Sequence, residues 1–160
     1  MDDHERKELL KKFMRKVAQP VFIVTAKAGE SFAGFTASSV TSLSLNPPLF
    51  MVGVEKGTNS EKVMREAKKF AISILVEGQE WIARKMAERV PALEKLSSVG
   101  YVLINDVPVI KDSQAYVILE KRGIWDIGDH IVVVGEVIDG IVRDFSKPLV
   151  YHEREYTTSC

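Results

Sequence analysis

The feature of this sequence that most constrains its fold is a succession of short β-branched and apolar runs separated by turn residues. The clearest runs are residues 21–26, 49–54, 70–76, 101–104, 115–119 and 130–134. Gly, Pro, Asn and Asp residues stand between them at spacings that suit β-hairpins. Because only a few helical segments interrupt the series, parallel strands joined by crossover helices are disfavoured. The sequence therefore predicts a mainly β protein with peripheral helices, built as a largely antiparallel barrel.

Three segments have the pattern of helices at the edge of such a barrel. Residues 1–18 place apolar side chains at helical spacing, which predicts an N-terminal amphipathic helix packed on the barrel. The motif Thr58-Asn-Ser-Glu61 is a capping box that predicts a helix start. A further helix is predicted to begin after Gly78 and to continue through Val90. No repeat or linker divides the chain, so residues 1–160 are expected to form one domain.

The charge balance and the cysteine content exclude several classes of function. The chain has 22 Lys+Arg against 22 Asp+Glu, whereas a nucleic-acid binder normally carries a basic excess. No apolar stretch reaches the roughly 18–20 residues that span a bilayer, and the N-terminus has no signal-peptide core. The lone Cys160 excludes an internal disulfide framework and a thiolate zinc site. We therefore expect a cytoplasmic protein without a nucleic-acid or membrane partner.

Several catalytic motifs are missing from the sequence. It has no Rossmann glycine pattern, no P-loop and no hydrolase elbow. The segment from His152 to Tyr156 begins like a zinc-protease motif, but Tyr156 stands where the second zinc ligand is needed. No metal site is expected.

Hydroxyl side chains are unusually dense between Thr36 and Ser44. From Ser38 to Leu45 they alternate with apolar residues, which predicts a strand with one polar and one buried face. Hydroxyls and turn amides can together bind a phosphate, because each donates a hydrogen bond to the anion. These hydroxyls can instead line a hydrated strand face or bond to neighbouring backbone. Composition alone favours this second explanation. Both explanations remain open at this point.

Two further polar features have similar pairs of explanations. Lys56 and Thr58-Asn-Ser60 stand at a predicted helix N-terminus, which attracts anions but can also be a simple cap beside a surface lysine. His130 follows a Gly-Asp turn at the mouth of an apolar strand. It can donate a hydrogen bond or a proton in a cleft, or it can be an ordinary edge residue.

Taken together and in order, these segments resemble a known family. The residues that carry the resemblance are Gly34–Val54 with its Asn-Pro-Pro turn, Phe70–Leu75, Gln79, Val107-Pro108, Gly128–Val137 and Pro148–His152. This combination resembles the flavin reductase-like family of FMN-binding split barrels. The resemblance implies a homodimer that holds one flavin per subunit near the interface. It also implies an enzyme that oxidises NADH or NADPH and reduces FMN or FAD, often to supply a partner monooxygenase.

The resemblance also implies roles for individual residues. The residues expected to contact the isoalloxazine and ribityl groups are Thr36, Ala37, Ser38 and Ser39. Those expected to approach the phosphate are Lys56, Thr58 and Ser60. His130 is expected to face the flavin where nicotinamide stacks, as the catalytic residue, and Tyr156 is expected to close the pocket. Because the flavin carries the redox chemistry, a transiently stacked NAD(P)H needs no Rossmann motif.

Two alternatives retain the same hydroxyl-rich strand. One is a flavoprotein that binds FMN and passes electrons to a protein partner without reacting directly with NAD(P)H. The other is a split barrel that has lost flavin and serves as an interaction module. The choices between NADH and NADPH and between FMN and FAD stay open.

Overall fold

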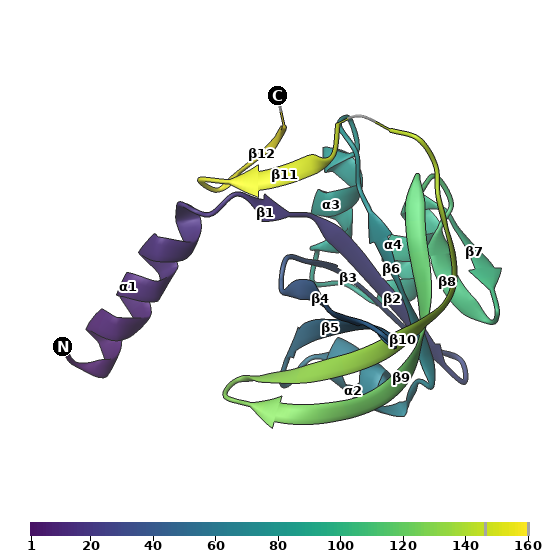
Figure 1. Ribbon diagram of the computed structural model, residues 1–160, viewed down its shortest axis with the longest axis horizontal. Helices are drawn as coiled ribbons and strands as arrows, with labels where there is room; N and C mark the ends of the chain where they lie inside the picture. The colour runs from purple at the N-terminus through teal and green to yellow at the C-terminus, as the bar shows by residue number, and fades with distance from the viewer. Residues whose placement is uncertain (146, 160) are drawn as a thin grey trace.

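A seven-stranded antiparallel sheet forms the body of the protein, with strand order β3-β2-β6-β9-β10-β5-β4 (Figure 1). Its strands are β2 (Phe22–Ala28), β3 (Ser31–Ala37), β4 (Val40–Leu45), β5 (Pro48–Glu55), β6 (Lys69–Ile74), β9 (Ala115–Ile127) and β10 (His130–Val142). The computed structural model describes residues 1–145 and 147–159, so the lone Cys160 lies outside the described residues. The antiparallel, mainly β architecture confirms the predicted fold class.

The order of the strands explains why the barrel is split. β3 and β4 are consecutive in the chain, yet they form the two opposite edges of the sheet. Ser38 and Ser39 join them. The backbone N–H of Gly53 in β5 donates to the carbonyl of Ser39 at 2.8 Å, which ties this connection to the far edge. The sheet therefore curls around a core that includes Phe70 and Ile131, both about 1% exposed or less.

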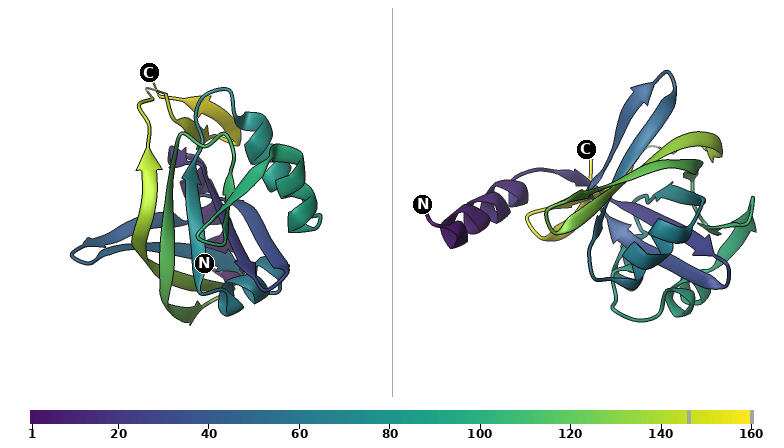
Figure 2. Two further views of the ribbon diagram at one scale, coloured as in Figure 1. Left: turned by 90° about the vertical axis from the view of Figure 1, so that its right-hand side faces the viewer. Right: turned by 90° about the horizontal axis from the view of Figure 1, so that it is seen from below.

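Within residues 1–145 and 147–159, four helices and two small sheets accompany this body (Figures 1 and 2). The helices are α1 (Asp3–Arg15), α2 (Asn59–Glu66), α3 (Glu80–Met86) and α4 (Ala92–Val99). The additional strands are β1 (Gln19–Pro20), β7 (Tyr101–Ile104), β8 (Val107–Ile110), β11 (Leu149–His152) and β12 (Glu155–Thr158). Within the described residues, no helix is long and apolar enough to cross a bilayer.

The segment after Gly78 differs from its prediction. Instead of one helix through Val90, α3 ends at Met86, and α4 begins at Ala92. α4 was missed because its buried face includes Lys95, which is 6% exposed and interrupts the apolar pattern. The connection between the two helices thereby becomes available to line a site.

The N-terminal helix forms as predicted but does not pack on the barrel of its own chain. The Asp2 carboxylate accepts from the Glu5 N–H at 2.8 Å and caps α1, yet none of its residues is buried. Leu10 and Phe13 are 62% and 65% exposed, and the helix projects from the body (Figures 1 and 2). The prediction failed because an amphipathic pattern indicates that a helix needs an apolar partner without saying which surface supplies it.

The strand predicted from Ser38 to Leu45 is confirmed from Val40 to Leu45, but its expected buried face was wrong. The strand is interrupted at Ser38 and Ser39, and within β4 Val40 is buried whereas Leu45 is 91% exposed. β4 is an edge strand in a hairpin with β5 that extends beyond the barrel (Figure 2). Leu43 and Leu45, which are 52% and 91% exposed, therefore have no neighbouring layer in this chain to cover them.

Candidate active site

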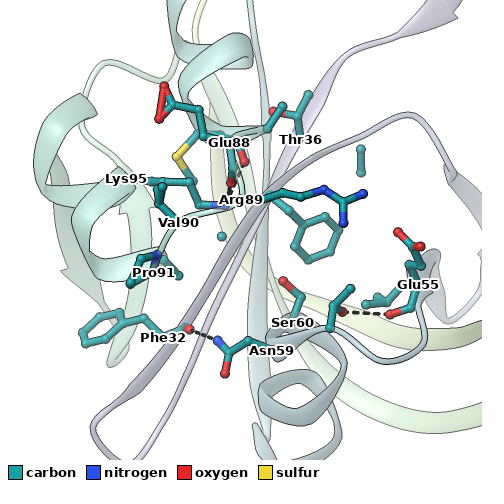
Figure 3. Close-up of a pocket in the computed structure, with 18 of the residues that line it drawn as sticks. Phe32, Thr36, Glu55, Asn59, Ser60, Glu88, Arg89, Val90, Pro91 and Lys95 are labelled. Carbon is teal, nitrogen blue, oxygen red and sulfur yellow. Dashed lines mark hydrogen bonds between the residues drawn. The ribbon is translucent and has the colours of Figure 1, made fainter.

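A cavity of about 940 Å³ lies beside the split of the barrel (Figure 3). Its walls come from β3 and the connection after it, the end of β5, the N-terminus of α2, the connection between α3 and α4, the start of α4, and the first residue of β10. The volume lies toward the upper end of the range for ligand pockets, about 300–1,000 Å³. The cavity therefore brings together segments that are far apart in the sequence.

β3 and the connection after it contain all four residues predicted to contact the ring and ribityl groups: Thr36, Ala37, Ser38 and Ser39. The Thr36 hydroxyl donates to the carbonyl of Ala83 at 2.6 Å, so it holds α3 against β3. Within the described part of the chain, the Ser38 and Ser39 hydroxyls have no hydrogen-bond partner. These two hydroxyls are therefore free to bond a ligand in the cavity.

The N-terminus of α2 forms a second wall. The Thr58 hydroxyl accepts from the Glu61 N–H at 3.1 Å and donates to the carbonyl of Glu55 at 2.8 Å. The Glu61 carboxylate accepts from the N–H of Gly57 at 2.8 Å, which confirms a helix start of the capping-box type. Because the Thr58 hydroxyl is already committed, this wall offers a ligand the Ser60 side chain and the positive end of the helix dipole.

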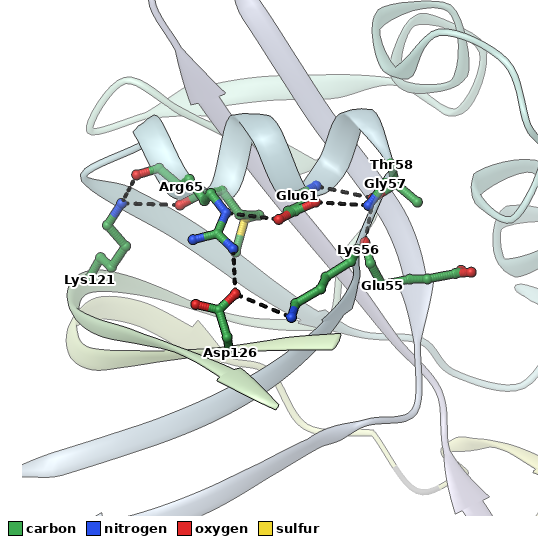
Figure 4. A network of polar contacts seen from close by, with 9 residues as sticks. Glu55, Lys56, Gly57, Thr58, Glu61, Arg65, Lys121 and Asp126 are labelled. Carbon is green, nitrogen blue, oxygen red and sulfur yellow. Dashed lines mark hydrogen bonds and ion pairs between the residues drawn. The ribbon is translucent and has the colours of Figure 1, made fainter. Parts of the chain in front are cut away.

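Lys56, which was expected near the phosphate, is not part of the cavity lining. Its ammonium lies 3.4 Å from a carboxylate oxygen of Asp126, and the Arg65 guanidinium binds the same oxygen at 2.8 Å (Figure 4). These contacts lower the pKa of the Asp126 carboxyl, with the Arg65 hydrogen bond as the largest cause. Lys56 therefore joins a surface network that fixes α2 to β9.

Tyr156 is also outside the cavity lining. Its ring packs against Tyr151 with centroids 5.2 Å apart, and the Arg84 guanidinium lies 5.3 Å from its centroid. Burial, and then the nearby Tyr151, raise the pKa of its hydroxyl. Within this chain, Tyr156 stabilises the packing of the β11–β12 hairpin against α3.

His130 lies on the cavity wall, as expected of the candidate catalytic residue. Its Nδ1 is 2.7 Å from the Oδ1 of Asp129, and this hydrogen bond is the main cause of the lowered pKa of the Asp129 carboxyl. A ring whose Nδ1–H is held by a carboxylate keeps Nε2 available for a second partner. The imidazole is therefore oriented by Asp129 while it remains at the cavity surface.

The connection between α3 and α4 supplies functional candidates that the sequence did not reveal. Glu88, Arg89, Val90 and Pro91 all line the cavity. The guanidinium of Arg89 extends toward the middle of the cavity in Figure 3. Among the described residues, no acidic group forms an ion pair with it. The Val90-Pro91 helix break was the one sequence signal that pointed to a loop here.

The donor set fits a flavin. A flat ring system needs apolar surface, which Phe35, Val54 and Val90 provide, and hydrogen-bond donors at its edge, which Ser38 and Ser39 provide. A phosphate needs a cation or helix N-terminus, and both are present on the walls of the same cavity.

Comparisons with known proteins agree with this geometry. Residues 14–159 match the family model described as the flavin reductase like domain. The 4-hydroxyphenylacetate 3-monooxygenase reductase component of Thermus thermophilus is 32% identical over 150 residues, covering 94% of this chain and 95% of that protein. The probable flavin reductase of Rhizobium meliloti is 35% identical over 123 residues, or 75% of this chain but 39% of that protein's length.

A solved structure extends the likeness to three dimensions. The crystal structure of the flavin reductase HpaC complexed with NADP+ has a TM-score of 0.88 to this chain and 32% sequence identity. The match covers 96% of this chain and 97% of that one. Since the family model covers nearly the whole sequence, this chain belongs to the flavin reductase-like domain family.

Proposed function

We propose that the cavity beside the barrel split binds a flavin, FMN or FAD, next to a site for the nicotinamide of NADH or NADPH. The chain is an NAD(P)H-dependent flavin reductase. The observation that carries the proposal is the meeting of Ser38, Ser39, Arg89 and His130 on the walls of one cavity. These residues come from three separate parts of the sequence, and each has a polar group suited to a flavin or a nicotinamide.

Each wall has a distinct part in the proposed site. The Ser38 and Ser39 hydroxyls bond the edge of the ring system and the ribityl chain, and Thr36 fixes α3 behind them. Arg89 and the α2 N-terminus bind the phosphate, with Ser60 beside them. Lys56 takes no part in the proposed site, because it pairs with Asp126 in the surface network.

His130 faces the nicotinamide side of the proposed site. The bound flavin supplies the redox chemistry, because its ring accepts a hydride from the reduced nicotinamide. The role of His130, whose Nδ1–H is held by Asp129, is to orient the reacting rings and accept a hydrogen bond at Nε2. The redox reaction thus depends on the relative placement of the two ring systems more than on an acid–base group of the protein.

We further propose that the working unit is a homodimer. The large apolar side chains Leu10 and Phe13 of α1 and Leu45 of the β4–β5 hairpin are all more than half exposed in the single chain. Covering such side chains with a second copy would remove apolar surface from water, at roughly 25 cal/mol per Å² buried. A reducing, cytoplasmic location fits the single cysteine of the sequence.

The acceptor of the reduced flavin is proposed from a relative. The Thermus thermophilus relative is named as the reductase component of a monooxygenase. We propose that this chain likewise supplies reduced flavin to a monooxygenase.

The test is steady-state oxidation of NADH and NADPH by the purified protein, with and without added FMN. The proposal predicts that at least one nicotinamide is oxidised and that added FMN increases the rate. No detectable oxidation of either nicotinamide, with FMN or FAD present, would overturn it.

A further inference from the structure

Lys95 of α4 is a buried cation in the lining of the cavity. It is 6% exposed, and its ammonium donates to the carbonyl oxygens of Met86 at 3.0 Å and Glu88 at 3.1 Å. Burial lowers the pKa of this ammonium, because the charged form loses hydration. A buried charge is tolerated where hydrogen bonds replace the lost water, and the two carbonyls do so here.

The two carbonyls mark the end of α3 and the start of the connection to α4. The last carbonyls of a helix have no N–H donor within that helix, so they need another partner. Met86 is the last residue of α3, and Glu88 lies two residues beyond it. Lys95 therefore attaches the connection to the first turns of α4.

Arg89 directly follows the second of these clamped carbonyls. Figure 3 shows Lys95 and Arg89 on either side of Glu88, with the guanidinium extended into the cavity. Within the described residues, no ion pair holds this guanidinium. Its direction thus depends on the backbone from which it extends, and Lys95 fixes that backbone.

We propose that Lys95 is a positioning residue for recognition of the flavin phosphate, acting through Arg89. The inference rests on the proposed function, since it assumes that Arg89 meets a phosphate in this cavity. Holding a connection in its bound conformation lowers the entropic cost of binding. Loss of the two hydrogen bonds from Lys95 leaves the Arg89 guanidinium present but able to adopt many orientations.

A second lysine in the chain provides a matched control. The Lys121 ammonium donates to the carbonyls of Met64 at 3.1 Å and Arg65 at 2.5 Å, at the C-terminal end of α2 (Figure 4). Burial lowers its pKa as well. Lys121 is not part of the cavity lining. The two lysines therefore make the same kind of clamp, one beside the proposed phosphate site and one away from it.

The experiment compares FMN with riboflavin, which has the same ring system and ribityl chain but no phosphate. Quenching of flavin fluorescence gives the Kd of each for wild type, Lys95→Met, Lys121→Met, Arg89→Met and the double variant with both Lys95→Met and Arg89→Met. Circular dichroism establishes that each variant is folded. If Lys95→Met does not fold, Lys95→Gln replaces it with the same expectations. The glutamine side chain is uncharged and too short to bridge the carbonyls of both Met86 and Glu88.

Lys95→Met is expected to raise the Kd of FMN by about tenfold or more, in keeping with loss of a charge-assisted contact, and that of riboflavin by less than about threefold. Lys95→Arg, which keeps the charge and the donors, should restore much of the FMN affinity. Lys121→Met should leave the ratio of the two Kd values at its wild-type value. In the Arg89→Met background, Lys95→Met should raise the Kd of FMN little further, because the effect of Lys95 passes through Arg89.

Three outcomes would overturn the inference. Equal weakening of FMN and riboflavin would make Lys95 a general structural residue. An unchanged FMN affinity in Lys95→Met would show that Lys95 has no part in FMN binding. Additive increases in the FMN Kd of the double variant would mean that Lys95 does not act through Arg89. Failure of the proposed function is distinct from all three, because wild type would then bind neither flavin.

Discussion

Gly53 and Ser39 continue the β4–β5 pairing by one residue, because the Gly53 N–H donates to the Ser39 carbonyl at 2.8 Å. A Cβ built on Gly53 would lie 3.1 Å from the Cβ of Ser39 and 3.7 Å from the Cδ2 of His130. The absence of a side chain at this position thus lets a proposed flavin contact and the candidate catalytic residue share one wall. The closeness of these residues leads to the first prediction.

Gly53→Ala is expected to weaken flavin binding by roughly tenfold, or about 1.4 kcal/mol, because Ser39 must move from its place on the wall. Fluorescence quenching by the purified variant measures the change. Gly78→Ala is the matched control: Gly78 has a φ of +91°, so alanine strains the backbone there, but it lies outside the cavity lining. The control should lose stability and keep wild-type flavin affinity. Equal flavin affinity in Gly53→Ala and wild type would contradict the proposed place of Ser39.

His130→Ala is expected to reduce the rate of flavin reduction by about tenfold or more while changing flavin Kd by less than about threefold. The ring is proposed to act on the nicotinamide side, so its removal disturbs the reacting geometry more than flavin binding. Stopped-flow mixing of the flavin-loaded protein with NADH separates the two effects. Asp129→Asn keeps an oxygen that can accept from Nδ1 and should have a smaller effect. Equal losses in rate and affinity would reassign His130 as a flavin-binding residue.

Acid is expected to loosen the α2 wall through Glu61. The Gly57 N–H, followed by Arg65, lowers the pKa of the Glu61 carboxyl below its usual 4.5. A carboxyl with a lowered folded-state pKa stabilises the fold above the unfolded-state pKa, and this contribution disappears as pH falls through the folded-state value. Glu61→Gln keeps an oxygen for the Gly57 N–H but loses the charge. Its Tm should lie below that of wild type at pH 7, and the two values should converge below pH 4.5. A Tm difference that persists unchanged into strong acid would refute the assignment.

The exposed face of α1 gives a prediction about assembly. Wild type is expected to sediment as a dimer, and Phe13→Glu to shift the dimer toward monomer by about a hundredfold or more in Kd, because a charge replaces an apolar contact. Lys12→Gln, on the same helix, is the control and should remain dimeric. Sedimentation at several concentrations measures both. A monomeric wild type at micromolar concentration would contradict the proposed homodimer.

The parts of the site that could be predicted from sequence are those formed by short local patterns. The hydroxyls of Ser38 and Ser39 were conspicuous because serine is uncommon in buried strands, and the structure places both on the cavity wall. The start of α2 was marked by its capping box at Thr58 and Glu61. His130 was marked by its Gly-Asp turn.

The parts that were missed depend on contacts between distant segments. Lys56 adjoins the α2 N-terminus in sequence, but its ammonium pairs with Asp126 of β9, a strand far along the chain, and it does not line the cavity. Arg89 reaches the site because the chain leaves its helix at Met86, and Lys95 can be buried because two carbonyls accept hydrogen bonds from its ammonium. Apart from the Val90-Pro91 helix break, none of these arrangements has a local sequence pattern.

The most direct test of the central claim is the visible absorption spectrum of the flavin-loaded protein before and after anaerobic addition of NADH, repeated with NADPH. We predict an oxidised flavin spectrum that bleaches on addition of at least one nicotinamide, and bleaching that slows in His130→Ala. A yellow protein that stays oxidised with both nicotinamides would instead indicate an electron carrier, and a protein that binds no added flavin would indicate an interaction module. Either result would contradict a reductase built around this cavity.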